Sequence, residues 1–161
     1  MRRFLVFFFT AVVVAASQCA AFAKPVITLK LSGAYVTRSA DGKEQLVPVS
    51  ARAAQPGEHI RWEIVATNSG DQPARNFVPS GKISPATTYV ANSGAAANAA
   101  VEFSLDSGKT WSSTPTVTVH SGDTVKTVNA DLSTYTAIRW RTAAPLAPGA
   151  SHRYVYEVVV R

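Results

Sequence analysis

Cysteine is almost absent from this chain. The only one, Cys19, lies in the first 23 residues, so a chain that loses that segment has no thiol for a disulfide or a thiolate site. The residues before it, Ala16 to Gln18, lack the aliphatic residue of a lipid-attachment site and have Gln18 at the last position, where such sites usually have a small residue. The sequence therefore predicts a domain held together by its core alone.

Long apolar runs are absent beyond the start of the chain. The one such run, Phe4 to Ala16, follows a short basic start and precedes Ala21-Phe22-Ala23, the small-x-small pattern of a signal-peptidase site. We expect residues 1–23 to be a cleaved signal peptide and residues 24–161 to form one domain. No stable membrane span is expected after cleavage, and the mature protein is expected in the periplasm or secreted.

The chain has no cluster of basic residues. It carries 16 Lys and Arg against 10 Asp and Glu, and without Arg2 and Arg3 the balance is 14 to 10, a net charge of +4. This modest surplus is spread along the sequence, whereas nucleic-acid interfaces concentrate Lys and Arg with interleaved aromatic residues. We expect no nucleic-acid partner and a weak attraction to an anionic cell envelope.

Helical periodicity is missing as well. Nine glycines stand mostly 9 to 15 residues apart, nearly all beside Asp, Asn, Ser or Pro, and this regular punctuation is typical of antiparallel sandwiches and barrels. Between them the apolar residues alternate with period two, most clearly at 59–68 and 151–160. The sequence predicts an all-β fold, either an antiparallel sandwich or a barrel.

The expected strands follow from this alternation. They are Val26–Leu31, Ala34–Arg38, Gln45–Val49, Glu58–Asn68, Ala74–Val78, Thr87–Val90, Val101–Leu105, Thr116–Val119, Val125–Val128, Thr136–Arg141 and Ser151–Val160. Asp41-Gly42 predicts a tight hairpin, and Ala91 to Ala100 reads as a loop without large side chains. Pro25 to Leu31 and the final strand are expected at sheet edges.

No catalytic or metal-binding set is visible. His59, His120 and His152 lack the spacing of metal ligands, and no nucleophile motif is present. Two carboxylates for glycoside hydrolysis would have to come from Glu63, Glu102, Asp106 and Glu157. All four alternate with apolar residues and are expected on solvated strand faces, so we predict no enzyme, no cofactor and no metal.

One short motif stands out at Ser104 to Trp111. Its pattern, Ser-x-Asp-x-Gly-x-Thr-Trp, resembles the Asp-box hairpin of sialidase propellers, where it lies away from the catalytic centre. It occurs once here, in a chain too short for a propeller. We expect a structural turn in which Asp106 binds backbone N–H groups, Gly108 supplies a positive φ and Trp111 packs beneath the hairpin.

Four arginines alternate with apolar residues on three expected strands. Arg61, Arg139, Arg141 and Arg153 would form an anion-binding patch if their strands were neighbours. The alternative is cross-strand ion pairing with Glu63, Glu102 and Glu157.

A family resemblance emerges from the turn and core residues of the segment Leu46 to Arg161. The stretches that carry it are Pro56-Gly57, Thr67–Gly70, Ala74–Val78, Thr88–Val90, the Asp-box hairpin, Ile138–Trp140 and Leu146–Ser151. They resemble the bacterial "conserved repeat" domain of unknown function found in cell-surface proteins. The resemblance implies an immunoglobulin-like sandwich exported to the envelope, although this chain carries a single copy and we expect no anchor after Arg161.

Together these observations favour a non-catalytic structural or protein-interaction module of the cell envelope with an unidentified envelope protein as partner. A carbohydrate-binding or sugar-cleaving protein is the first alternative, suggested by the Asp box and by Trp62, Trp111 and Trp140. A subunit of a surface fibre assembled by strand addition is the second.

Overall fold

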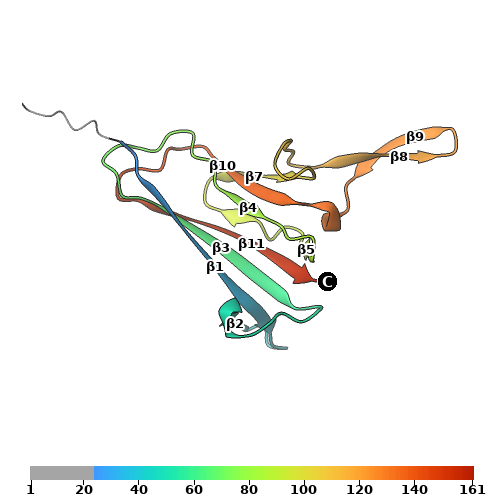
Figure 1. The fold of residues 1–161 in the computed structure, drawn as a ribbon, viewed down its shortest axis with the longest axis horizontal. Coiled ribbons are helices and arrows are strands. Elements are labelled where there is room, and N and C mark those ends of the chain that lie inside the picture. The colour runs from blue at the N-terminus through green and yellow to red at the C-terminus, as the bar shows by residue number, and fades with distance from the viewer. Residues whose placement is uncertain (1–23) are drawn as a thin grey trace, which may run out of the picture.

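The computed structural model describes residues 24–161, and the expected signal peptide at residues 1–23 lies outside the described residues. The described chain is all-β, with every strand pair antiparallel (Figure 1). Its only helical elements are two 3-10 turns, η1 (Val49–Ala51) and η2 (Leu132–Thr134). The prediction of an all-β fold is confirmed.

The larger sheet has six strands in the order β2-β1-β3-β11-β5, with β6 pairing to β11. These strands are β1 (Ile27–Arg38), β2 (Glu44–Pro48), β3 (His59–Asn68), β5 (Thr87–Tyr89), β6 (Ala95–Ala96) and β11 (Ser151–Val160). The Asp41-Gly42 hairpin joins β1 to β2, with Gly42 at φ 78°. The strands β1 and β3 pair along ten residues, so this sheet forms the broad layer of the molecule.

The smaller sheet has three strands in the order β4-β10-β7, which are β4 (Ser80–Lys82), β10 (Ala137–Thr142) and β7 (Ala99–Ser104). A separate two-stranded ribbon, β8 (Thr116–Ser121) and β9 (Thr124–Asn129), extends away from both sheets (Figure 1). We call this ribbon the arm. Every residue of its two strands is exposed.

The core lies between the two sheets. Ile138 and Trp140 of β10 and Tyr154 and Val158 of β11 have at most 1% of their surface exposed. The Trp140 ring centroid lies 5.5 Å from that of Tyr154, a distance at which aromatic pairs attract each other beyond their area of burial. Two facing layers joined by aromatic side chains give a sandwich-like molecule.

The alternation that predicted β3 decides which side chains enter this core. Ile60, Ile64 and Ala66 point inward and are buried, while Arg61 and Glu63 occupy the opposite face. Successive side chains of a strand point to opposite sides of the sheet. The sequence alternation is therefore the cause of the inner and outer faces.

The first two predicted strands, Val26–Leu31 and Ala34–Arg38, are one continuous strand in the structure. The prediction of a break at Gly33 is wrong because this glycine serves packing rather than a turn. A Cβ atom on Gly33 would lie 2.6 Å from the ring of Trp62, which sits opposite it on β3. The glycine thus leaves space for an aromatic ring over the middle of β1.

Three further expectations are corrected. The predicted strand Ala74–Val78 is absent, because Asn76 has a φ of 56° and only Ala74 bridges to Leu146. A strand that was not predicted, β4, follows it. The expected loop Ala91 to Ala100 contains β6 and the start of β7, because its small residues can approach the core closely.

The final strand, expected at an edge, lies inside the larger sheet with β3 on one side and β5 and β6 on the other. The first segment, Pro25 to Leu31, was also expected at an edge, and most of it does lie in a part of β1 that pairs on one side only. Ile27–Gly33 of β1 pairs with β3 on one side, and no described strand pairs with its other side. We call Ile27–Gly33 the open edge. No helix in residues 24–161 has the length and apolar character needed to cross a bilayer.

Candidate functional site

Each of the four carboxylates considered for sugar cleavage makes an ion pair or hydrogen bonds within the fold. Glu63 pairs with Arg153, and Glu102 lies 2.6 Å from Arg139 Nε. The hydrogen bond from Arg139 holds the pKa of the Glu102 carboxyl below its usual range. A general acid needs a raised pKa near the working pH, and this arrangement provides the opposite.

Glu157 departs from the sequence expectation of a solvated position, since only 6% of the residue is exposed. Its carboxylate accepts hydrogen bonds from Arg38 Nη2 at 2.9 Å and Arg61 Nε at 2.8 Å. Burial alone would raise the pKa of Glu157, but these hydrogen bonds outweigh it and leave the pKa below its usual range. This buried ion pair stabilises the outer face of the larger sheet, and Arg38 could not be assigned to it from local sequence.

The four arginines that would form an anion-binding patch if their strands were neighbours lie on two different sheets. Arg61 and Arg153 belong to adjacent strands of the larger sheet, while Arg139 and Arg141 lie on β10 of the smaller one. Each is paired with a carboxylate: Arg61 with Glu44 and Glu157, Arg153 with Glu63, and Arg139 and Arg141 with Glu102. The structure thus shows the cross-strand ion pairs rather than one shared patch.

The Asp-box turn is built on Asp106. Its carboxylate accepts hydrogen bonds from the backbone N–H groups of Thr110 and Lys109, at 2.8 and 3.0 Å, and these bonds lower the pKa of the carboxyl. Gly108 has a φ of 92°, and Trp111 Nε1 donates to the Gly108 carbonyl at 2.9 Å. Asp106 and Trp111 thus form hydrogen bonds within the turn, and Gly108 has the positive φ that the turn requires.

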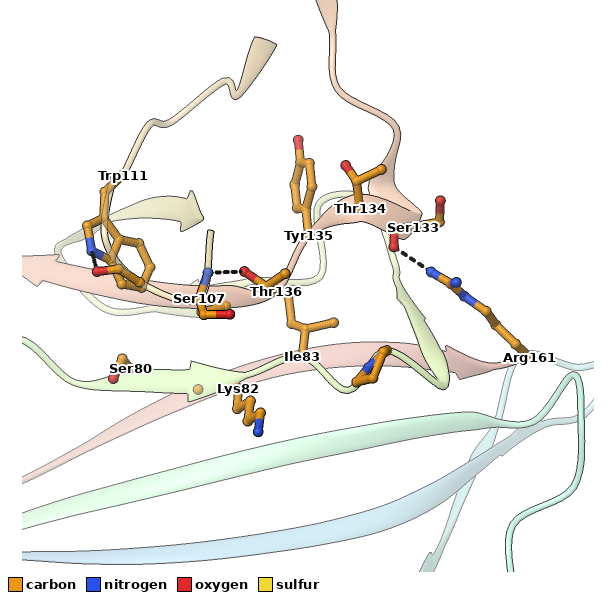
Figure 2. A pocket seen from close by; sticks show the side chains of 14 residues that line it. Ser80, Lys82, Ile83, Ser107, Trp111, Ser133, Thr134, Tyr135, Thr136 and Arg161 are labelled. Atoms are coloured by element: carbon orange, nitrogen blue, oxygen red, sulfur yellow. Dashed lines mark hydrogen bonds between the residues drawn. The ribbon is translucent and has the colours of Figure 1, made fainter. Parts of the chain in front are cut away.

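A pocket of about 800 Å³ lies beside this turn (Figure 2). Its wall includes Trp111, Tyr135 and Arg161, and Ser107 N donates to Thr136 Oγ1 at 2.9 Å within it. The Arg139 guanidinium lies 4.5 Å from the Trp111 ring centroid, so one aromatic face already has a cationic neighbour. Among residues 24–161, the side chains that line the pocket offer hydroxyl and cationic groups but no carboxylate.

The three tryptophans occupy different environments. Trp140 is fully buried, Trp62 is half-buried on the inner face of β3, and Trp111 is half-buried at the Asp-box turn. They lie on different elements and do not form one exposed aromatic surface. The carbohydrate-binding alternative therefore has two separate, partly exposed aromatic contacts, Trp62 and Trp111.

The histidines lie apart from one another in the fold, at the starts of β3 and β11 and on the arm. Within residues 24–161 no three His, Cys, Asp or Glu side chains lie close enough to hold a metal together. His59 Nδ1 is 3.9 Å from Glu157 Oε2, which makes it a neighbour of the buried ion pair.

A second hollow, of about 480 Å³, lies along the open edge between the two sheets. Its wall is mostly apolar and includes Leu29, Leu31, Trp62, Ile64 and Tyr156. We call it the groove. On its other side lies β4, which pairs with β10 alone.

The two leucines of the groove are unusual for inward-facing residues. Leu31 lies opposite Ile64 and Leu29 opposite Ala66, so all four belong to the inner face of the larger sheet. Ile64 and Ala66 are buried, whereas Leu29 is 54% and Leu31 61% exposed. The smaller sheet ends at β4 and does not extend over β1, which leaves this apolar face open.

The groove was only partly foreseeable from sequence. The segment Pro25 to Leu31 was expected at an edge, but β4 was not predicted and its three residues, Ser-Gly-Lys, carry no strand signal.

No family model matches this chain, and no curated protein or solved structure matches it either.

Proposed function

We propose that this protein is an exported, non-catalytic interaction module of the cell envelope with an immunoglobulin-like β-sandwich. Its open edge and groove receive an extended strand from a protein partner. The observation that carries the proposal has two parts: no strand of residues 24–161 pairs with the second side of Ile27–Gly33, and Leu29 and Leu31 of that segment are exposed.

One added strand would both bond the free backbone groups of the open edge and cover the apolar side chains of the groove. An edge strand presents a row of backbone N–H and C=O groups that an added strand can bond. The groove in addition presents apolar side chains at alternate residues, and a strand supplies apolar side chains at that same period. The outer-face arginines Arg38, Arg61, Arg139 and Arg153 are already paired with carboxylates, which favours the edge over an arginine patch as the binding site.

The proposal is tested in intact cells by placing a photo-cross-linking amino acid at Leu31. A matched control carries it at Lys109, an exposed residue of the Asp-box turn. We expect a covalent adduct with a polypeptide from position 31 and none from position 109. The cross-linked chain should begin at Lys24 when its N-terminus is sequenced. Absence of an adduct at 31, or the same adduct from both positions, would contradict the proposal.

A further inference from the structure

The arm is a second feature of this fold that lacks a covering layer. Its strands pair from Thr116 with Asn129 to Ser121 with Thr124 and join through Gly122, which has a φ of 58°. A two-stranded ribbon is marginally stable on its own in water and needs packing against other elements. The arm points away from both sheets (Figure 1), so the two sheets of residues 24–161 do not supply this packing.

One face of the arm carries three of its four valines, and Lys126 lies on that face opposite Val119. Val117 lies directly opposite Val128, and Val119 follows on the same face two residues later. These valines are 37%, 41% and 42% exposed. The face repeats its apolar side chains at the same spacing as Leu29 and Leu31 on the open edge.

We infer that the groove of one copy receives the arm of a second copy, with β8 added to the open edge of β1. This inference rests on the proposed function and names its partner. Pairing β8 with Ile27–Gly33 would bond the free backbone groups of both strands. It would also place Val117 and Val119 on the side of the sheet that carries Leu29 and Leu31.

Charge is compatible with this contact. The arm holds one Asp and one Lys, Asp123 and Lys126, and is therefore neutral apart from His120. Lys82 on β4 is the cationic side chain that lines the groove, while Lys30 points to the opposite face of β1. A basic strand would be repelled there, whereas the neutral arm is not.

The arm and the groove are different surfaces, so their contact is heterologous. Heterologous contacts produce rings or open chains of copies rather than closed two-fold dimers. A symmetric alternative, in which the open edges of two copies pair with each other, would cover Leu29 and Leu31 but leave the valines of the arm exposed. The observations favour the arm because it covers both apolar surfaces at once.

The test uses the protein purified after export with its own leader. One variant carries Val117→Lys and Val119→Lys on the arm, and the other carries Leu29→Lys and Leu31→Lys on the open edge. All four side chains are exposed, and circular dichroism checks that each variant is folded. Sedimentation velocity over a range of concentrations measures the species present.

We expect the unaltered protein to form species that grow beyond the dimer with concentration, and each variant alone to lose every species above the monomer. An equimolar mixture should regain a species of twice the monomer mass and nothing larger, because only one arm and one groove remain intact between the two. Dimers of the arm variant would indicate edge-to-edge pairing and overturn the inference. So would an unaltered protein that stays monomeric at its highest soluble concentration. If Leu31 still cross-links to a different polypeptide in cells, the proposed function stands without this partner.

Discussion

Two neighbouring tyrosines of β11 show how closely the chemistry of single residues follows from their surroundings. The Tyr156 hydroxyl donates to the Lys82 carbonyl at 2.8 Å, and burial raises the pKa of this phenol to about 12. The Tyr154 hydroxyl is buried and has no hydrogen-bond partner among residues 24–161. A buried polar group without a partner destabilises the fold, whereas a satisfied one contributes to stability.

Replacing each hydroxyl by hydrogen should therefore affect the free energy of unfolding differently in the two tyrosines. Tyr156→Phe is expected to lower the free energy of unfolding by about 1 kcal/mol. Tyr154→Phe is expected to leave it unchanged or to raise it, because the aromatic contact with Trp140 is kept. Urea denaturation followed by circular dichroism measures both values. Equal losses in the two variants would show that the Tyr154 hydroxyl has a stabilising contact after all.

For single residues, the sequence predicted which face of the sheet a side chain lies on better than it predicted which residues that side chain contacts. The alternation correctly placed Trp140 inside and Arg61 and Glu63 outside. It could not predict that Glu157 would be buried beneath Arg38, because Arg38 is 119 residues away in the chain. A local pattern reports the direction of a side chain, and its neighbours depend on which strands pair.

At the scale of elements, β1 runs without a break through Gly33, because the missing side chain at this position leaves room for the Trp62 ring. Trp62 Cζ3 would lie 2.6 Å from a Cβ at position 33, closer than atoms in contact can approach. The indole ring is rigid, but it borders the groove and has room to move outward. Any side chain at position 33 should therefore displace the ring into the groove.

We expect Gly33→Ala to shift tryptophan emission to longer wavelength and to lower the free energy of unfolding by about 1–2 kcal/mol. Ser32→Ala is the matched control, since Ser32 is the exposed neighbour on the opposite face of β1. Emission and stability should be unchanged in the control. A more stable Gly33→Ala protein with unaltered emission would mean that Trp62 does not rest on this glycine.

The elements that the sequence missed are short and depend on tertiary contacts. The strand β4 has three residues and forms because Pro79, Gly81 and Ile83 meet β10 and the core. Gly81 lies so close to the Tyr156 ring that a Cβ there would be 2.7 Å from it. No local alternation marks such a strand. The long strands β3 and β11, which carry ten residues each, were predictable because their pattern repeats several times.

At the scale of the whole molecule, the unequal width of the two sheets creates the groove. The smaller sheet has three strands and covers the middle of the six-stranded one. The sequence contains the exposed leucines of β1 as an ordinary alternating pattern, which predicts a buried face. Only the pairing of β4 with β10 shows that nothing in residues 24–161 covers them.

The carboxyl groups with shifted pKa values all destabilise the fold in the same way when they take up protons in acid. The carboxyl pKa values that are shifted all lie below the ordinary range, at Asp41, Glu44, Glu58, Glu102, Asp106, Asp131 and Glu157. Most of these groups are at the surface and contribute little individually. Glu157 is the buried member, with 8% of its side chain exposed.

The unfolded chain, with carboxyl pKa values of about 4, takes up protons before the folded one as the pH falls. The stability that depends on these groups should therefore be fully present above about pH 5 and be lost progressively below about pH 4. At pH 7, Glu157→Gln should lower the free energy of unfolding by about 2–3 kcal/mol, because Arg38 and Arg61 lose their charged partner. Glu63→Gln, which alters an exposed pair with Arg153, should change it by about 0.5 kcal/mol or less. In urea titrations from pH 7 to pH 3, the difference between the unaltered protein and Glu157→Gln should narrow as Glu157 becomes protonated. A difference that stays constant down to pH 3 would mean that the loss in this variant arises from packing rather than from the charge of Glu157.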